Sequence, residues 1–346
     1  MATKEIVLEA LTRNKGSFVS GEFLAELCGV SRTAVWKSVK KLREDGFYIE
    51  GTTNGGYLLK DNFDSEDIFS KDLFSFYFQN NYPDFKDSKI ECFKEIDSTN
   101  SYAKRLLSEA GNLYSSDGTL TEAGKTLKNS VYVAESQTAG RGRMGRSFVS
   151  PSGSGIYLSV IYAPQNGITN PALLTAFTAV AVKRAIFKIC GIEAKIKWIN
   201  DLFYNNKKIC GILAEGITNF ETGIIEAAVI GIGINITDNP DVFPDDVKKI
   251  AGSIGKKVSR CELAAAVSGE VLSIFDEKQS DVIREYKNAS FLIGENVFVH
   301  PIIFTEAGIY KARAIDIDEN AGLVVQKEDG TIITLRSGEV RVRPEE

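Results

Sequence analysis

A segment rich in glycine and arginine lies near the middle of the chain and limits the folds that the sequence can adopt. Residues 137–146 read Gln-Thr-Ala-Gly-Arg-Gly-Arg-Met-Gly-Arg and include the spacing Gly-x-Gly-x-x-Gly of dinucleotide-binding βαβ folds. Such a fold needs a helix directly after the loop. Here the next residues include Pro151, Gly153 and Gly155, and a strand-type run follows at 156–162. The sequence therefore disfavours a dinucleotide-binding fold and predicts a loop that leads into a strand.

The same loop has the composition of an anion-binding site. Glycines let backbone N–H groups approach a ligand closely, and the planar fork of arginine matches phosphate and carboxylate oxygens. The loop interleaves three glycines with three arginines: Gly140, Gly142, Gly145, Arg141, Arg143 and Arg146. This pattern favours an anionic, phosphate-bearing ligand. The alternative is a mobile surface loop whose arginines are solvated.

Scarce residue types narrow the chemistry further. The 346 residues contain five cysteines with no Cys-x-x-Cys pair and one histidine, His300, in a strand-type run. The sequence has too few suitably spaced cysteines and histidines for a zinc site or a histidine-activated nucleophile. Lysine, arginine and amide groups are therefore expected to carry any catalysis. No apolar run approaches the roughly 18 residues of a membrane span, and the first residues lack the apolar core of a signal peptide. We expect a cytoplasmic protein with no membrane partner.

Residues 1–60 have the pattern of a winged helix-turn-helix. Ser20 and Ser31 are expected to cap two helices separated by a tight turn at Gly29. A glycine-rich turn at 51–56 between two strand-type runs supplies the wing. The residues expected to face inward are Phe23, Leu24 and Leu27 on one helix, and Val35, Val39 and Leu42 on the next.

The second of these helices is basic. The span from Ser31 to Arg43 has five cations and no acid, although the whole chain has a net charge of −5. A local basic face in an acidic protein indicates a polyanion at that place. The predicted DNA-binding residues are Arg32, Thr33, Trp36, Lys37 and Lys40. The alternative is a helical cap or dimerisation unit with a solvated basic face.

The rest of the chain divides into three parts. Residues 61–90 form an aromatic-rich connector, residues 91–290 mix helix and strand patterns, and residues 291–346 read as short strands joined by tight turns. Within the middle part, residues 110–130 are expected to form a surface insertion. A buried strand at 224–230 is expected to lead into a turn at 231–235.

Three further motifs accompany the glycine–arginine loop. Ser98-Thr99-Asn100 precedes a helix, where its hydroxyls can cap the helix and also face a ligand. The second motif, Lys197-Trp-Ile-Asn-Asp201, is a polar turn after a strand, which is a common place for active-site groups. The third motif is Gly231-Ile-Gly-Ile-Asn235. Taken alone, the first is a helix cap and the second a solvated edge lysine. The chain has no Gly-x-x-x-x-Gly-Lys-Ser/Thr, so a P-loop would not hold ATP.

The order and spacing of these four motifs resemble those of the biotin–protein ligase family, and with the winged helix the chain resembles its bifunctional ligase/biotin operon repressor members. The resemblance implies an α+β protein with an N-terminal winged helix-turn-helix (1–60) and a connector (61–90). It further implies a central mixed α/β ligase domain of class II synthetase type (91–290) and a small C-terminal SH3-like β-barrel (291–346).

The resemblance also implies a reaction and its partners. Biotin and ATP would form biotinyl-5′-AMP, with Mg²⁺ neutralising the pyrophosphate, and the biotin would pass to a lysine of a biotin carboxyl carrier domain. Operator DNA and a second copy of the chain, paired when the adenylate is bound, are the other implied partners. Three competing functions stay open: a ligase with an idle winged helix, a ligand-sensing regulator without ligase activity, and a lipoate-type ligase.

Site residues follow from the resemblance by their position in the motifs. Lys197, Arg141 and Arg143 are the implied catalytic residues. The implied biotin-binding set is Ser98, Thr99, Asn100, Gln137, Arg141, Gly142, Arg143, Lys197 and Gly233. The implied nucleotide-binding set is Arg143, Arg146, Phe148, Asn200 and Asn235, with Arg336 expected to approach the nucleotide. Two positions depart from the family pattern: Ile199 stands where proline is usual, and Phe148 stands where a larger aromatic, often Trp, stacks on adenine.

Overall fold

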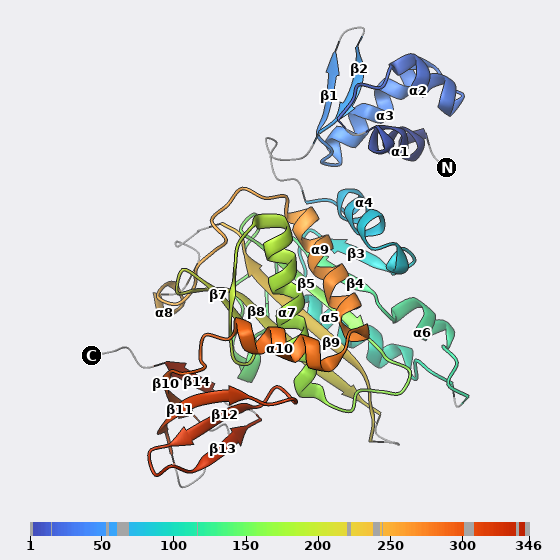
Figure 1. The fold of residues 1–346 in the computed structure, drawn as a ribbon. Helices are drawn as coiled ribbons and strands as arrows, with labels where there is room; N and C mark the ends of the chain where they lie inside the picture. The colour runs from blue at the N-terminus through green and yellow to red at the C-terminus, as the bar shows by residue number, and fades with distance from the viewer. Residues whose placement is uncertain are drawn as a thin grey trace.

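Three β-sheets organise the protein. The computed structural model describes residues 3–14, 16–52, 55–60, 69–115, 117–219, 223–237, 243, 245–300, 308–336 and 339–342. Within these residues lie a two-stranded N-terminal sheet, a seven-stranded central sheet and a five-stranded C-terminal sheet. Figure 1 shows the N-terminal part projecting at the top and the C-terminal sheet below the central part. None of the described helices is long and apolar enough to cross a membrane.

The N-terminal part is a winged helix. Its elements are α1 (Thr3–Arg13), α2 (Gly21–Cys28), α3 (Arg32–Glu44), β1 (Ile49–Thr52) and β2 (Gly56–Leu59). The Ser20 hydroxyl accepts from the Phe23 N–H at 3.0 Å, and the Ser31 hydroxyl accepts from the Ala34 N–H at 3.3 Å. Both predicted N-caps are therefore confirmed, and α3 buries its three predicted residues. Residues 53–54 of the predicted turn lie outside the described residues.

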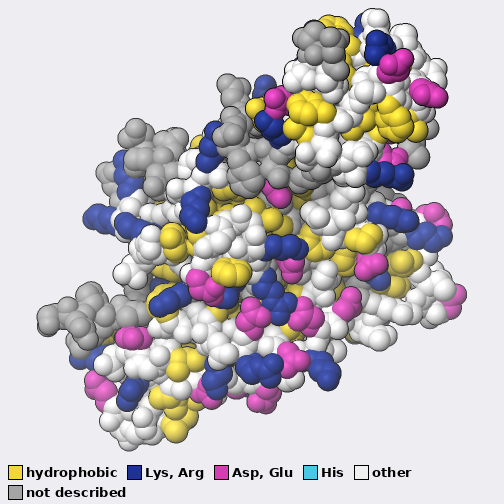
Figure 2. Space-filling model, turned by 45° about the horizontal axis from the view of Figure 1, so that its top comes forward, with side chains coloured by type: hydrophobic (Ala, Val, Ile, Leu, Met, Phe, Trp, Pro, Cys, Tyr) yellow, Lys and Arg dark blue, Asp and Glu magenta, His cyan; other side chains and the backbone are white. Residues whose placement is uncertain are grey.

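Helix α2 differs from the sequence prediction. Leu24 is fully buried, but Phe23 and Leu27 are each 49% exposed. A helix of eight residues that packs on α1 and α3 buries one narrow stripe, and Phe23 and Leu27 lie beside that stripe. In Figure 2 hydrophobic side chains are visible on the surface of this projecting part.

Helix α4 (Lys71–Asn81) and a 3₁₀ turn, η1 (Pro83–Phe85), connect the winged helix to the central sheet. Ser70 caps α4 by accepting from the Leu73 N–H at 3.2 Å, and its hydroxyl donates to the Asp45 carbonyl at the end of α3. Lys4 bonds the carboxylates of Asp45 at 2.9 Å and Asp72 at 2.5 Å. The end of α3 is thus tied to the start of α4. Residues 61–68 of the predicted connector lie outside the described residues.

The central sheet has the strand order β3-β4-β5-β9-β8-β7-β6, in which β3 and β4 are parallel and the other neighbours antiparallel. Its strands are β3 (Ile90–Phe93), β4 (Val131–Ala134), β5 (Gly155–Tyr162), β6 (Lys195–Lys197), β7 (Asp201–Tyr204), β8 (Lys207–Thr218) and β9 (Ile225–Asn235). Val131 and Val133 join the hydrophobic cluster on one face, and Tyr132 joins the cluster on the other. Both faces are therefore covered, as the alternation of a strand requires.

Helices cover the two faces unequally. One face carries α5 (Thr99–Ala110) and α6 (Glu122–Leu127). The other carries α7 (Pro171–Cys190), α9 (Arg260–Ser273) with η4 (Ile274–Asp276), and α10 (Gln279–Ala289); the short α8 (Asp245–Lys248) and η2 (Arg143–Gly145) lie in connections. Asn170 caps α7, and Ser259 caps α9.

Two expectations for the middle part are wrong. Residues 231–235 are not a turn, because β9 continues through them and pairs with β5 and β8. The stretch 110–130 is not a simple surface insertion, since Leu113 and Leu127 are buried against α5 in the second hydrophobic cluster. In both places tertiary packing overrides the local signal of glycines and polar residues.

The C-terminal part is an antiparallel sheet with the order β13-β12-β11-β10-β14. Its strands are β10 (Asn296–His300), β11 (Tyr310–Ile317), β12 (Leu323–Lys327), β13 (Ile332–Leu335) and β14 (Glu339–Val342). The last of these had no counterpart in the sequence prediction. Ala314, Leu323 and Val325 are fully buried and join the large hydrophobic cluster.

Candidate active site

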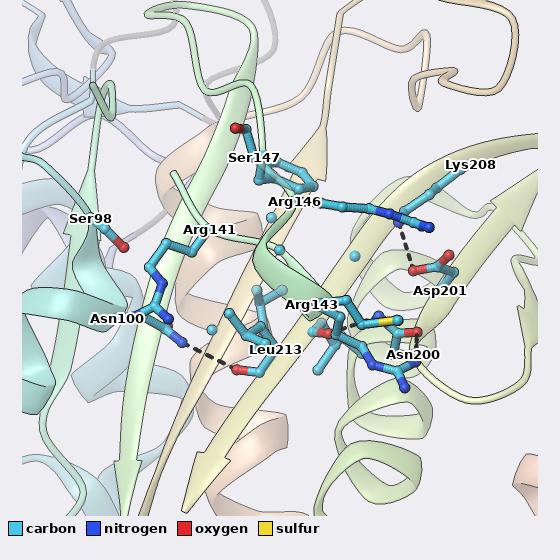
Figure 3. A pocket seen from close by; sticks show the side chains of 18 of the residues that line it. Ser98, Asn100, Arg141, Arg143, Arg146, Ser147, Asn200, Asp201, Lys208 and Leu213 are labelled. Atoms are coloured by element: carbon cyan, nitrogen blue, oxygen red, sulfur yellow. Dashed lines mark hydrogen bonds and ion pairs between the residues drawn. The ribbon is translucent and has the colours of Figure 1, made fainter. Parts of the chain in front are cut away.

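A cavity of about 510 Å³, a size usual for small-molecule sites, lies beside the N-terminal end of α5. The first residues of α5, the loop 137–148, the turn between β6 and β7, and strands β8 and β9 all contribute to its lining. All four sequence motifs therefore meet here, and each implied biotin- or nucleotide-binding residue except Asn235 and Arg336 lines the cavity. Figure 3 shows Ser98 and Asn100 on one side and Asp201 and Lys208 on the other.

One side of the cavity is a network of hydroxyl and amide groups. Gln137 accepts from the Thr99 N–H at 2.9 Å and donates to the Ser150 hydroxyl at 2.9 Å. The buried Ser159 hydroxyl donates to Asn100 Oδ1 at 2.6 Å and lies 2.7 Å from Thr99 Oγ1. These bonds fix the orientation of each donor and acceptor, so this side suits an uncharged polar group of a ligand.

Glu215 of β8 holds one arginine of the loop. Its Oε1 lies 3.3 Å from Arg141 and 2.8 Å from Lys104, and its Oε2 accepts from the Asn100 amide at 3.0 Å. Burial alone would raise the pKa of Glu215, but the bonds from Lys104 and Asn100 and the charge of Arg141 hold that pKa below its ordinary value of 4.5. The carboxylate is therefore charged at neutral pH.

The opposite side of the cavity is cationic. Lys208 Nζ lies 2.7 Å from Asp201 Oδ1, and Lys197 Nζ lies 5.7 Å from the centre of the Phe203 ring. Of these groups the sequence motifs assigned a role to Lys197 alone. The tight Asn205-Asn206 turn returns the chain so that Lys208 pairs with Phe203 across the strands, and that register would have indicated Lys208.

A hydrogen bond joins the glycine–arginine loop to the β6–β7 turn. Arg143 Nη1 donates to Asn200 Oδ1 at 2.9 Å, and the Asn200 amide donates to the Ile212 carbonyl at 2.9 Å. In the same turn the peptide bond between Trp198 and Ile199, at the position where the family usually has proline, is cis.

The glycines of β9 admit neighbouring side chains. A Cβ on Gly231 would lie 2.1 Å from Asn100 Oδ1, and a Cβ on Gly233 would lie 2.4 Å from the Phe148 ring. Glycine inside a strand marks such a close approach. The motif at 231–235 thus shapes the cavity wall without making a turn.

Two residues implied for the nucleotide lie away from the cavity lining. Asn235 is buried at the end of β9, where its amide donates to the Gly252 carbonyl at 2.9 Å. Arg336 forms an ion pair with Asp318 at 2.8 Å in the C-terminal sheet. Both side chains make contacts within the protein where the resemblance implied contacts with the nucleotide.

The cysteines lie outside the lining of this cavity, and all five are free. Burial raises the pKa of the Cys210 thiol, and it raises that of Cys92 to about 12. Thiols with raised pKa values are poor nucleophiles. Among the described residues no group of three or more His, Cys, Asp or Glu side chains could hold a metal ion.

A second candidate site lies on the winged helix. The five predicted DNA-binding residues are all exposed on α3, and Lys40 lies 5.9 Å from the centre of the Trp36 ring. Two other cations of this helix have partners nearby: Lys41 pairs with Asp45 at 3.3 Å, and Arg43 donates to the Ile49 carbonyl at 2.8 Å. Both side chains remain exposed on the helix, so these contacts restrain them without removing them from the surface.

Comparison with known protein families defines the class of the chain. Residues 4–58 match the model of an HTH domain, and residues 114–235 match the biotin/lipoate A/B protein ligase family. The biotin protein ligase of Aquifex aeolicus, solved in complex with biotin and ATP, has 25% sequence identity and a TM-score of 0.57. That likeness covers 74% of this chain and 99% of the Aquifex chain.

Full-length relatives identify the family. The bifunctional ligase/repressor BirA of Bacillus subtilis is 30% identical over 336 residues, which cover 94% of each chain. The BirA protein of Escherichia coli is 27% identical over 99% of this chain and 98% of its own. The chain belongs to the family of bifunctional biotin–protein ligases and biotin operon repressors.

Proposed function

We propose that the cavity binds biotin and ATP and joins them into biotinyl-5′-AMP before the biotin passes to a carrier lysine. The chain is an ATP-dependent biotin–protein ligase and a transcriptional repressor, as its family membership implies. The observation that supports this site is the meeting of four motifs, more than 130 residues apart at their extremes, around one cavity with a polar side and a cationic side.

The polar side would hold the ureido ring of biotin. That ring offers one strong acceptor and two donors, and Ser98, Thr99 and Gln137 present small hydroxyl and amide groups at one end of the cavity. Asn100 orients this set through its bonds to Ser159 and Glu215.

The cationic side would carry the adenylation. The carboxylate of biotin attacks the α-phosphorus of ATP in line, so catalysis consists of positioning and charge stabilisation. Lys197, Arg141 and Arg143 are the proposed catalytic residues, and Lys208, held by Asp201, adds a fixed charge. Arg146 and Asn200 would contact the nucleotide, and the half-buried Phe148 ring would pack against adenine.

Magnesium fits this side of the cavity. Mg²⁺ is usually bound by one or two carboxylates together with substrate phosphates and waters. Asp201 supplies one carboxylate in the lining, so it is the residue that would hold the ion. When bound, the ion would neutralise charge on the departing pyrophosphate.

The repressor function would use α3. One winged helix contacts few phosphates, so we propose that two copies bind a two-fold-symmetric operator and that the adenylate favours their pairing. The biotin carboxyl carrier domain as acceptor and a location in the cytoplasm belong to the same proposal.

One assay tests the proposed reaction. The protein is incubated with Mg-ATP, labelled biotin and a biotin carboxyl carrier domain, and label is expected on the carrier. A parallel reaction with labelled lipoate separates the two branches of the matched family. Label on the carrier from lipoate alone, or from neither compound, would contradict the proposal.

A further inference from the structure

The C-terminal sheet reaches the cavity wall through one buried hydrogen bond. The indole Nε1 of Trp198 donates to the carbonyl of Ala321 at 2.9 Å. Both residues are buried, and Trp198 lines the cavity between Lys197 and Asn200 in the β6–β7 turn. A residue from the last 30 residues of the chain therefore fixes the side chain in the middle of the catalytic motif.

The turn that presents this carbonyl is held in one conformation. Ala321 has a φ of +61°, which non-glycine residues rarely adopt. The carboxylate of Asp318 accepts from the N–H groups of Asn320 at 3.0 Å and Gly322 at 2.7 Å. Arg336 of the same sheet pairs with that carboxylate at 2.8 Å. Asp318 thus organises residues 318–322, which we call the bracing turn.

The bracing turn is also fixed against two helices of the central part. Asn320 Oδ1 accepts from the side chain of Asn170, the N-cap of α7, at 2.9 Å. The Glu319 carbonyl accepts from Gln279, the first residue of α10, at 2.7 Å. The turn therefore has two attachments besides Trp198, which suits it to hold an orientation.

The β6–β7 turn depends on such support for its own geometry. On its other side the buried Tyr286 hydroxyl donates to the Ile199 carbonyl at 3.0 Å. Asn200 in turn receives Arg143 at 2.9 Å. A displacement of Trp198 would thus shift Lys197, its neighbour in the backbone, and would shift Arg143 through the hydrogen bond to Asn200.

We propose that the bracing turn is a positioning element for the adenylation step, in which Asp318 acts through Ala321 and Trp198 to set Lys197 and Asn200. Asp318 is a positioning residue and not a catalytic one, because it does not line the cavity. The proposal rests on the function assigned above to the 197–201 turn. It adds that the C-terminal sheet contributes to the rate of adenylation and not to the binding of biotin.

The test uses the full chain and the two tryptophans of the sequence. Trp36 is replaced by Phe in every protein, so that Trp198 is the one remaining indole. In this background, Asp318→Ala is expected to lower kcat for adenylate formation roughly 10-fold to 100-fold, since a misplacement of about 1 Å costs on that order. KM for biotin is expected to stay unchanged, and the Trp198 emission to shift to longer wavelength.

Two matched variants separate positioning from general weakening of the sheet. Asp329 makes a similar turn bond, accepting from the Thr331 N–H at 2.9 Å in the same sheet, so Asp329→Ala is expected to keep the parent kcat and emission. Asp318→Asn keeps an oxygen acceptor for both N–H groups and is expected to restore most of kcat. Equal losses in Asp318→Ala and Asp329→Ala would overturn the proposal.

A double-mutant cycle provides the direct test of the bond. Trp198→Phe removes the N–H donor and keeps a ring, and its effect on kcat is expected to be non-additive with that of Asp318→Ala. If Asp318→Ala does not fold, Trp198→Phe alone decides, and a parent kcat in that variant overturns the proposal. A parent protein that makes no adenylate contradicts the proposed function, whereas an active parent with unaffected variants contradicts the bracing turn alone.

Discussion

The cavity and helix α3 are two basic regions that differ in how firmly their cations are held. In the cavity, Arg141, Arg143 and Lys208 each contact a fixed polar or acidic partner, at 3.3, 2.9 and 2.7 Å. On α3, Lys37 and Lys40 are exposed, and the contact that Lys40 makes is with the face of Trp36. The cavity holds these three charges in place, and the helix leaves Lys37 and Lys40 in solvent.

This difference separates two kinds of function. Fixed charges in a cavity stabilise a transition state without reorganising, and solvent screens them little. Exposed lysines contribute to affinity for a polyanion mainly by releasing counterions, so their effect depends on salt. Adenylation is therefore expected to respond sharply to single substitutions and weakly to salt, and DNA binding to do the reverse.

The largest effect is expected from the cavity lysines. Lys197→Ala and Lys208→Ala should each lower the rate of adenylate formation by about 10²- to 10³-fold, the usual loss when one charge-stabilising donor is removed. Pyrophosphate release in single-turnover reactions measures it. Lys195, exposed on the same strand as Lys197, provides the control, and Lys195→Ala should keep the parent rate.

A normal rate in Lys197→Ala with a large loss in Lys208→Ala would correct the assignment in an informative way. That result would indicate that the reacting carboxylate and α-phosphate lie near Lys208 and not near Lys197. Normal rates in both variants would contradict the contrast between fixed and solvated charges.

A smaller effect is expected on α3. Replacing Lys37 and Lys40 together by Ala should weaken operator binding roughly 10-fold to 100-fold and reduce the slope of log affinity against log salt by about 2. Carrier biotinylation should continue at the parent rate. Binding titrations at several salt concentrations provide the measurement, and Lys41→Ala, which removes a cation already paired with Asp45, is the matched control. An unchanged slope in the double variant would mean that the winged helix is idle.

Local signals explain which parts of the fold could be predicted from the sequence. The N-caps at Ser20 and Ser31 depend on residues three positions away, and the structure confirms them. The inward face of α3 follows from its helical periodicity, and it is also confirmed. The prediction of the inward face of α2 was wrong because its own residues do not distinguish Leu24 from Leu27. Packing against the neighbours α1 and α3 decides which stripe is buried.

The cavity shows the same limit at longer range. The motifs that carry unusual residue combinations could be found in the sequence and lie together in the structure. Lys208 and Glu215 carry no such combination, because a lysine and a glutamate on a strand look like any exposed positions until the pairing of β7 with β8 and the approach of Asn100 are considered. The prediction of a turn at Gly231 and Gly233 was wrong for the same reason. The side chains that occupy the space beside these glycines come from distant residues, Asn100 and Phe148.

A still smaller effect is expected from the loop that joins the two sides of the cavity. Arg143→Ala removes the bond to Asn200, and Gly142→Val places a branched side chain where a Cβ would lie 3.3 Å from the Arg146 carbonyl oxygen. Both should shorten the lifetime of bound adenylate by roughly 10-fold, because each weakens closure over the intermediate. Release of labelled adenylate measures the lifetime, and thermal unfolding checks that stability is little changed. Equal lifetimes in variant and parent would remove the loop from the retention of the intermediate.

The smallest effect concerns Glu215, which sets the resting position of Arg141. The pKa of Glu215 in the folded protein is held below 4.5 by Lys104, Asn100 and Arg141, against the effect of burial. A carboxyl whose pKa is lowered by folding stabilises the native state above its unfolded pKa and loses that contribution as pH falls through the folded pKa. The free energy of unfolding of the parent should therefore exceed that of Glu215→Gln at pH 7, and the difference should shrink below pH 4.5.

Urea unfolding from pH 7 to pH 3 measures this difference. Lys104→Met in the parent should reduce the same pH dependence, because Lys104 makes the shortest bond to this carboxylate at 2.8 Å. A pH-independent difference would mean that folding leaves the pKa of Glu215 unchanged, and the resting position of Arg141 would then need another anchor.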